Sequence, residues 1–291
     1  MTDWLKSMQQ TFEYYIVDPT TWKDAKRIDN VRSCTISRDL EAETLGSATI
    51  DIAESLGECY IRAYLIAIQN GVSDKHPLGT ILVQTPSSNF DGKIREVSMD
   101  AYTPLLELKE SPPPIGYYVP KRANIMDVAY QLVRDHARAP VVKNNSATKM
   151  FSDFVANTND TWLTFIRDLI ANAKFKLSLD ELGRILFAPD QDTASLQPVW
   201  IYTDDNSSIL YPELQMDHDL YGIPNAVEVI YSSNNEYYYA KVVNDDPNSP
   251  ISTVNRGREI LHRETSPSLI GDPTENKIQE YAEAASRIVD S

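Results

Sequence analysis

Strand-like segments crowd the first hundred or so residues, and no other feature limits the fold as strongly. They combine β-branched and aromatic residues with alternation between apolar and polar positions, and turn residues separate them. In one of them Ala48, Ile50 and Ile52 fall on the same face. Together the segments predict a β-barrel or sandwich; they are residues 12–19, 32–39, 47–55, 60–71, 77–86 and 93–104. The helical spacing of apolar residues within residues 1–10 predicts a short helix before the first strand.

A proline run marks a boundary. Pro112, Pro113 and Pro114 are consecutive, and such a run fits neither a helix nor a central strand, so it predicts a stiff connector. The apolar period then becomes helical. Asn124 is a suitable cap for one helix, and a second helix follows Asp160. Two apolar stripes support these helices: Ile125, Val128, Ala129, Leu132 and Val133 in the first, and Trp162, Phe165, Ile166, Leu169 and Ile170 in the second.

Strand signals return after this helical unit. Residues 174–189 predict a hairpin with its turn at residues 180–183, where Gly183 suits a positive φ. Further strands are predicted at residues 199–203, 225–232, 236–244 and 258–264, with a polar loop at 243–253 and an amphipathic helix at 274–291. A helix that continues to Ser291 without a stop signal suggests a truncated chain or a helix that docks elsewhere.

The predicted fold class is therefore mainly β with an α+β insertion. Two β-barrel-like domains flank a small helical and hairpin unit, and a helix ends the chain. The expected boundaries are an N-terminal β-barrel at 1–111, a proline-rich connector at 112–122, a small α/β insertion at 123–190, a second barrel-like domain at 191–264, and a C-terminal loop and helix at 265–291.

Composition narrows the classes of partner. The formal net charge is −15, which argues against nucleic-acid recognition and against docking on an anionic membrane. The two cysteines, Cys34 and Cys59, are too few for a disulfide framework and predict free, buried thiols. No segment has the ~18 apolar residues of a membrane span, and residues 1–10 lack the pattern of a secretory signal. We therefore expect folding in a cytoplasm.

Residues with the potential for chemistry are scattered. The chain lacks the common nucleotide-binding, hydrolase and metalloprotease motifs. The triplet Asp217-His218-Asp219 would point its His away from its acids in a strand, and the acid pairs Asp204-Asp205 and Asp245-Asp246 lie in turn-like segments. His136, near a helix end, is interpreted as a surface residue that suits the helix dipole. The sequence predicts no catalytic residue, no cofactor and no metal site.

Tyrosine is the conspicuous excess, with 16 residues against 7 phenylalanines. Several tyrosines are adjacent, and because adjacent strand residues face opposite sides, each group offers a tyrosine to both faces. Aromatic residues of this kind are enriched in the cores of protein interfaces. We therefore predict a protein interface, with a sugar-binding platform as the alternative. The candidate interface residues are Tyr14, Tyr15, Tyr117, Tyr118, Tyr237, Tyr238 and Tyr239.

Several segments, in their order along the chain, resemble the central hub proteins of phage tails and baseplates, a family that includes late-control proteins and the base of VgrG spikes. They include FEYYIVDPTTW, PLGTILVQTPS and DAYTPLLEL in the first third, TWLTFIRDLIANAKFKLSLDELGRILFAP in the middle, and IPNAVEVIYS later. The resemblance covers residues 12–254. It implies a homotrimer in which three chains, each with two barrel-like domains, form a pseudo-sixfold ring between a sixfold tail tube and a threefold tip.

The resemblance also implies a location and partners. The chain would lie in the tail of the virion after assembly in the host cytoplasm. Its neighbours would be the tail tube protein, distal tail or baseplate proteins, a spike or tail-tip protein and the tape measure protein, with no sequence-specific nucleic acid and no stable membrane insertion. An acidic channel would repel passing DNA. The alternatives are a carbohydrate- or cell-surface-binding tail module, and a hydrolase whose site the sequence does not reveal.

Overall fold

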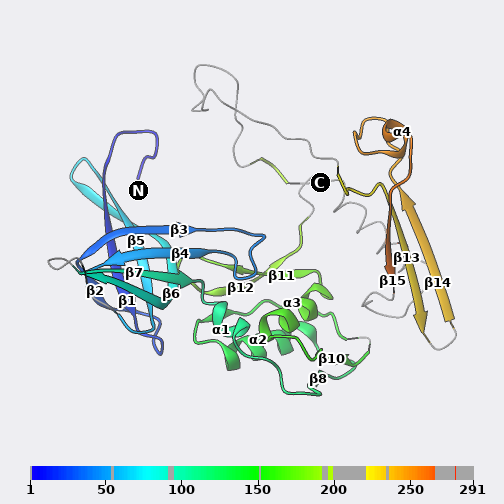
Figure 1. The fold of residues 1–291 in the computed structure, drawn as a ribbon, viewed down its shortest axis with the longest axis horizontal. Coiled ribbons are helices and arrows are strands. Elements are labelled where there is room, and N and C mark those ends of the chain that lie inside the picture. Colours follow the sequence, from blue (N-terminus) through cyan, green and yellow to red (C-terminus); the bar gives the residue numbers. More distant parts are fainter. Residues whose placement is uncertain are drawn as a thin grey trace. The chain divides into compact units, whose positions relative to one another are not determined.

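The computed structural model describes residues 2–53, 56–90, 95–150, 152–191, 196–198, 221–233, 236–265 and residue 279 (Figure 1). The chain divides into two compact units, residues 1–190 (unit 1) and residues 191–291 (unit 2). The finer domain boundaries expected from the sequence stay predictions. In the described residues, no helix has the length and apolar character needed to cross a bilayer.

Unit 1 begins with a seven-stranded sheet in which every neighbouring pair is antiparallel. The strand order is β2-β1-β5-β6-β7-β4-β3. All six strand segments predicted in the first third lie in this sheet, and β2 is the strand that the sequence pattern missed. The strands are β1 (Gln9–Val17), β2 (Asp24–Ile28), β3 (Val31–Ser37), β4 (Ser47–Ile52), β5 (Cys59–Gln69), β6 (Val72–Phe90) and β7 (Arg95–Tyr102).

The sheet is strongly curled. Its two edge strands, β2 and β3, are consecutive in the chain and are joined by Asp29 and Asn30 alone. Three Cα–Cα steps span at most about 11 Å, whereas seven strands laid flat would separate the two edges by about 29 Å. The curl encloses an apolar interior to which Ile50, Ile61 and Met99 contribute, each fully buried.

The predicted β-barrel is nevertheless not closed. In the described part of unit 1 no pairing joins β2 to β3, so the sheet keeps two edges. The burial pattern gives the physical reason, because β2 is exposed along its length and only Ile28, its last residue, is partly buried against the interior. The sheet is barrel-like in curvature but open along this seam.

The N-terminal helix predicted within residues 1–10 is also wrong. Residues 2–8 form turns and irregular structure before β1. The Thr2 hydroxyl donates to Asp74 at 2.9 Å, and Asp3 exchanges hydrogen bonds with the Gln69 side chain. These contacts hold the segment against the β5–β6 hairpin, and this tertiary pairing overrides the weak helical pattern.

The remainder of unit 1 is a small helical portion with short strands. Helix α2 (Ile125–His136) is capped as predicted, since the Asn124 side chain accepts a hydrogen bond from Asp127 N–H. Helix α3 (Trp162–Ala171) begins at a capping box formed by Thr161 and Thr164. The other elements are α1 (Leu106–Lys109), β8 (Tyr118–Val119), β9 (Val141–Val142), β10 (Phe154–Val155), β11 (Phe175–Leu179) and β12 (Ile185–Pro189).

The predicted hairpin is the pair β11–β12, and its turn contains Gly183 with φ of 74°. Strand β12 also pairs in parallel with β9. The helices and this small sheet share one core in which both predicted apolar stripes are buried, Val128 partly. Trp22 and Leu45 lie in connections between strands of the large sheet, and they pack against the same core.

The described part of unit 2 contains a three-stranded sheet of order β14-β13-β15. Its elements are β13 (Ala226–Ser233), β14 (Glu236–Val243), α4 (Thr253–Arg256) and β15 (Leu261–Thr265). Strands β14 and β15 lie on opposite sides of β13, so the chain passes from one edge of the sheet to the other between them, and the segment predicted as a polar loop is part of this crossover. The predicted second barrel is not formed by these strands. The predicted strand at 199–203 lies outside the described residues, as does the predicted helix at 274–291 except for residue 279, which is helical.

Asn225 fixes the crossover. Its side chain accepts from Ile260 N–H at 2.7 Å and donates to Arg258 O at 3.0 Å, and the residue is almost fully buried. Its backbone carbonyl also accepts from Asn244 N–H. One amide side chain therefore aligns the start of β13 with the segment that leads into β15.

Candidate interaction surfaces

The first tyrosine pair lies on β1 and is used within the chain. Tyr14 is half-buried against the interior of the sheet, whereas Tyr15 lies on the outer face. The Tyr15 ring packs edge-on against Tyr64 at 5.8 Å, and the Lys75 ammonium lies 4.0 Å from one ring and 3.9 Å from the other. The Tyr15 hydroxyl donates to Glu13. A partner protein that bound here would contact side chains that already have partners within the chain.

The two tyrosines of the second pair differ more clearly in burial. Tyr117 packs edge-on against Trp162 and Phe165, at 5.0 and 5.5 Å, as part of the core of unit 1. Tyr118 points outward and is 54% exposed. Directly across the strand pair lies Val155, which is 55% exposed. This pair therefore contributes one core residue and one surface residue.

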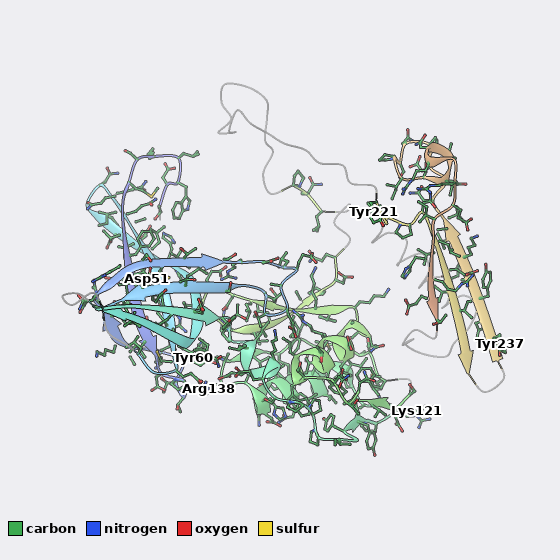
Figure 2. The ribbon with its side chains drawn as sticks, viewed as in Figure 1. Asp51, Tyr60, Lys121, Arg138, Tyr221 and Tyr237 are labelled. Carbon is green, nitrogen blue, oxygen red and sulfur yellow. The ribbon has the colours of Figure 1, made fainter. Side chains whose placement is uncertain are left out.

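The third group lies on β14, an edge strand of the sheet in unit 2. Tyr238 packs on the small core formed by Val227, Val229 and Ala240. Tyr237 and Tyr239 lie on the opposite face and are 77% and 55% exposed (Tyr237 is labelled in Figure 2). These two side chains form the largest aromatic surface that the described part of the candidate set offers.

A charged row crosses the same face of this sheet. Glu228 of β13 is opposite Lys241 on one side and Arg263 on the other. The Glu228 carboxylate accepts from the Arg263 guanidinium, and this bond, followed by one from Tyr239, holds the pKa of Glu228 below its usual range. Lys241 in turn pairs with Glu259 at 2.7 Å. The face is thus an ordered mixture of charge and exposed aromatic rings.

Two arginine sites, a buried one at Arg62 and a partly exposed one at Arg138, join the large sheet to the helical portion of unit 1, and sequence reasoning missed both. Arg62 of β5 is almost fully buried. It donates to Thr80 Oγ1 and Asp24 at 2.9 Å each, and to Leu182 O at 3.0 Å in the hairpin turn. The Trp22 indole N–H donates to the same Leu182 carbonyl at 2.8 Å. The sheet and the β11–β12 turn are therefore tied through one carbonyl oxygen.

The second site lies where α1 meets the sheet. Arg138 pairs with Glu107 and, at 2.9 Å, with Glu58, and its guanidinium lies 5.2 Å from the ring centre of buried Tyr60 (Figure 2). Burial, followed by the charge of Glu107, raises the pKa of the Tyr60 hydroxyl. This hydroxyl stays neutral at physiological pH. The only sequence-level indication of either site was a charged residue inside or beside an apolar strand.

Among the described residues, those with potential for chemistry are not brought together. Asp246 caps its own turn, where its carboxylate accepts from Asn248 N–H, while Asp204, Asp205 and residues 217–219 lie outside the described residues. Across the described ranges no group of three His, Cys, Asp or Glu side chains is placed to hold a metal ion. Burial raises the pKa of Cys34 to about 11 and also raises that of Cys59.

His136 differs from its interpretation as a simple surface residue. Its ring stacks on the Trp162 indole with centroids 4.1 Å apart and an angle of 20°, so it is part of the aromatic packing of unit 1. A small cavity of about 20 Å³ lies between the large sheet and the hairpin turn, lined among others by Ile36, Gly79 and Asp180. This volume suits a water molecule and not a substrate.

Comparison with known proteins places the fold. No protein-family model matches the chain, and a search of curated proteins found no similar sequence. Solved structures do match. A tail protein from Neisseria meningitidis MC58 superposes with a TM-score of 0.60 at 14% identity, over 95% of this chain and 77% of that one. The 43 kDa tail protein of prophage MuSo2 from Shewanella oneidensis gives 0.59 at 11% identity, over 96% and 78%.

The prophage tail protein gp18 from Listeria monocytogenes EGD-e gives 0.50 at 11% identity, over 87% of this chain and 72% of that one. At these identities the likeness is one of fold. The chain therefore has the mainly β fold found in solved phage and prophage tail proteins. The family resemblance predicted from the sequence is confirmed at this level.

Proposed function

We propose that this chain is a structural protein of a phage tail and forms the central hub of a tail tip or baseplate. In this role three copies form a ring that adapts the sixfold tail tube to a threefold tip and lines the DNA channel. The observation that carries the proposal is the extent of the shared fold, which covers 95% and 96% of this chain in its superpositions on two tail proteins.

Charge and surface support this role. The net charge of −15 suits a channel wall through which DNA passes without sticking. The exposed Tyr237 and Tyr239 suit contact with other protein chains. The expected neighbours are the tail tube protein, distal tail or baseplate proteins, a spike or tip protein and the tape measure protein, all within the virion.

Copy number tests the proposal directly. Cryo-electron microscopy of assembled particles, or native mass spectrometry of isolated tail tips, should show three copies of the chain per tail at the end of the tube. The threefold expectation follows from the proposed symmetry mismatch with the tube. Six copies per tail, or a position outside the tail, would refute the hub assignment.

Paired substitutions test the non-catalytic part of the proposal. Replacement of Asp204, Asp205, Asp245 and Asp246 by Asn should leave assembly and infectivity nearly unchanged, because the sequence predicts that these acids lie in turns, and surface substitutions in turns cost little. Replacement of Tyr237 and Tyr239 by Ala should reduce assembly by removing aromatic area from one face of β14. Normal particles that lose infectivity with the Asn set would instead point to an ion site or catalytic site and contradict this reading.

A further inference from the structure

A ribbon on the helical portion of unit 1 carries an unusual surface. Residues 117–124 run antiparallel to the described residues of the segment 149–156 (149–150 and 152–156) through the β8–β10 pair, a hydrogen bond of 2.8 Å from Arg122 N–H to Met150 O, and a bridge between Asn124 and Lys149. One face of this ribbon, which includes Val119, packs into the core of the unit. The other face is exposed.

The exposed face of the ribbon is apolar at one end and basic at the other. Tyr118 and Val155 lie opposite each other on adjacent strands, close enough for one apolar side chain of a partner to contact both. Lys121, Arg122 and Lys149 are exposed beyond them (Lys121 is labelled in Figure 2). Asp153 is the only acid in the two ribbon segments, in a chain whose net charge is −15.

The loop between β3 and β4 has the complementary character. Asp39, Leu40 and Glu41 are all exposed, and Leu40 is 86% exposed. The loop is held in shape, because Glu41 N–H donates to Asp39 Oδ1 at 2.9 Å and the nearby Glu43 pairs with Lys109 at 2.6 Å. It therefore presents an apolar side chain between two carboxylates on a fixed tip.

We propose that the 39–41 loop of one copy docks on the 117–124/149–156 ribbon of a second copy. Leu40 would cover Tyr118 and Val155, while the two carboxylates of the loop face Lys121 and Arg122. The inference deepens the proposed function, on which it rests, by assigning surfaces through which copies of the hub contact each other. Like charges repel over most of such an acidic chain, so a local basic patch sets which part of the neighbour is accepted.

The contact also sets the kind of assembly. The loop and the ribbon are different surfaces, so the contact is heterologous and passes from each copy to the next. Such contacts give a ring when the rotation between copies closes and an open filament when it does not, and they do not produce a twofold dimer. A single loop tip buries much less than the area of a stable interface; its role is therefore to orient copies whose other surfaces add affinity.

A charge swap in the full-length chain tests the proposal. Sedimentation velocity over a concentration series gives the association strength of the wild type and of two double variants, Lys121→Glu/Arg122→Glu and Asp39→Lys/Glu41→Lys. Each double variant should weaken association on the order of tenfold or more, because two attractive contacts become repulsive. The variant that combines all four substitutions should recover association, because it restores the attraction with the signs exchanged.

A matched control keeps the result specific. Lys23 and Lys26 are exposed residues in or beside β2, and Lys23→Glu/Lys26→Glu makes the same charge change at residues that belong to neither proposed surface. It should associate as the wild type does, and circular dichroism should show that every variant is folded.

The other outcomes are decisive as well. If the double variants associate as strongly as the wild type, or if the combined variant recovers nothing, the contact is wrong while the ring proposal stands. A wild type that forms only a twofold dimer would also show that the proposed contact is wrong. A wild type that stays monomeric at every concentration overturns both the contact and the ring.

Discussion

The Arg62 site gives the sharpest test of how unit 1 is held together. The change is Arg62→Met, which keeps most of the apolar stem and removes all five N–H donors. In the wild type the Arg62 side chain is 5% exposed and its guanidinium contacts Asp24 at 2.9 Å. The substitution leaves that carboxylate without its cation and removes the hydrogen bond from Arg62 to Leu182 O, one of the links between the hairpin turn and the sheet.

The size of the effect follows from what remains. Breaking a buried ion pair by removing one partner costs about 3–5 kcal/mol. Asp24 keeps the Tyr64 hydroxyl at 2.8 Å and some contact with solvent, and the Leu182 carbonyl keeps the Trp22 indole N–H. Both groups thus stay partly satisfied, so the free energy of unfolding should fall by about 3 kcal/mol, the low end of the range.

Arg27→Met is the matched control. Arg27 lies on the same sheet and contacts two carboxylates, Glu13 at 2.8 Å and Asp29 at 3.0 Å, where Arg62 contacts one, but the Arg27 side chain is 52% exposed. Exposed pairs of this kind contribute about 0–1 kcal/mol. The two variants therefore separate burial from the number of ion-pair contacts.

Urea unfolding followed by tryptophan fluorescence provides the measurement. A Trp200→Phe background leaves Trp4, Trp22 and Trp162, all in unit 1, so the signal reports this unit alone. If Arg62→Met lowers the free energy of unfolding by less than about 1 kcal/mol, or by no more than Arg27→Met does, the Arg62 site does not hold the sheet to the helical portion and the reasoning fails.

Three further predictions concern packing and titration. Trp162→Ala should cost about 3–5 kcal/mol in urea unfolding because the indole is buried, whereas Trp4→Ala, at an exposed position, should cost under about 1 kcal/mol; equal costs would contradict the core. With the other cysteine replaced by serine, alkylation of Cys34 should show a pH midpoint near its raised pKa of about 11, and a midpoint near the free-thiol value of about 8.5 would show an exposed thiol. Gly183→Ala should lower thermal stability by about 1–3 kcal/mol, since φ is 74° and a Cβ would approach the Thr80 Cβ to 2.6 Å; an unchanged melting temperature would contradict this close approach.

Local patterns predicted most elements of unit 1 because their causes are local. Asn124 caps α2 through a bond three residues away, and the apolar stripe of α3 is buried as its spacing implied. Strand β2 was not predicted because its residues are mostly exposed, so its sequence shows no alternation between buried and exposed positions. The Asn70-Gly71 turn of the β5–β6 hairpin, with positive φ at both residues, was an available signal for pairing these strands.

Closure and tertiary sites were beyond these patterns. A barrel and an open curled sheet have the same alternation, and whether β2 pairs with β3 depends on contacts along the whole edge. In the sequence, Arg62 is a single charged residue within an apolar strand, and its partner Leu182 lies 120 residues away. Similarly, the tyrosine pairs predicted that both faces of their strands would be used. They could not predict that Lys75, which lies over the Tyr15 ring, comes from another strand.

The strand order of the large sheet also constrains how the sheet can be completed during synthesis. The β1–β2 and β3–β4 pairs come first in the chain, yet they belong to opposite ends of the order β2-β1-β5-β6-β7-β4-β3. Neither pair has its remaining neighbour until later residues leave the ribosome, because β1 waits for β5 and β4 waits for β7. The first half of the sheet therefore emerges as two separate hairpins with unpaired edges, and the β5–β6–β7 meander joins them only after about a hundred residues have been made.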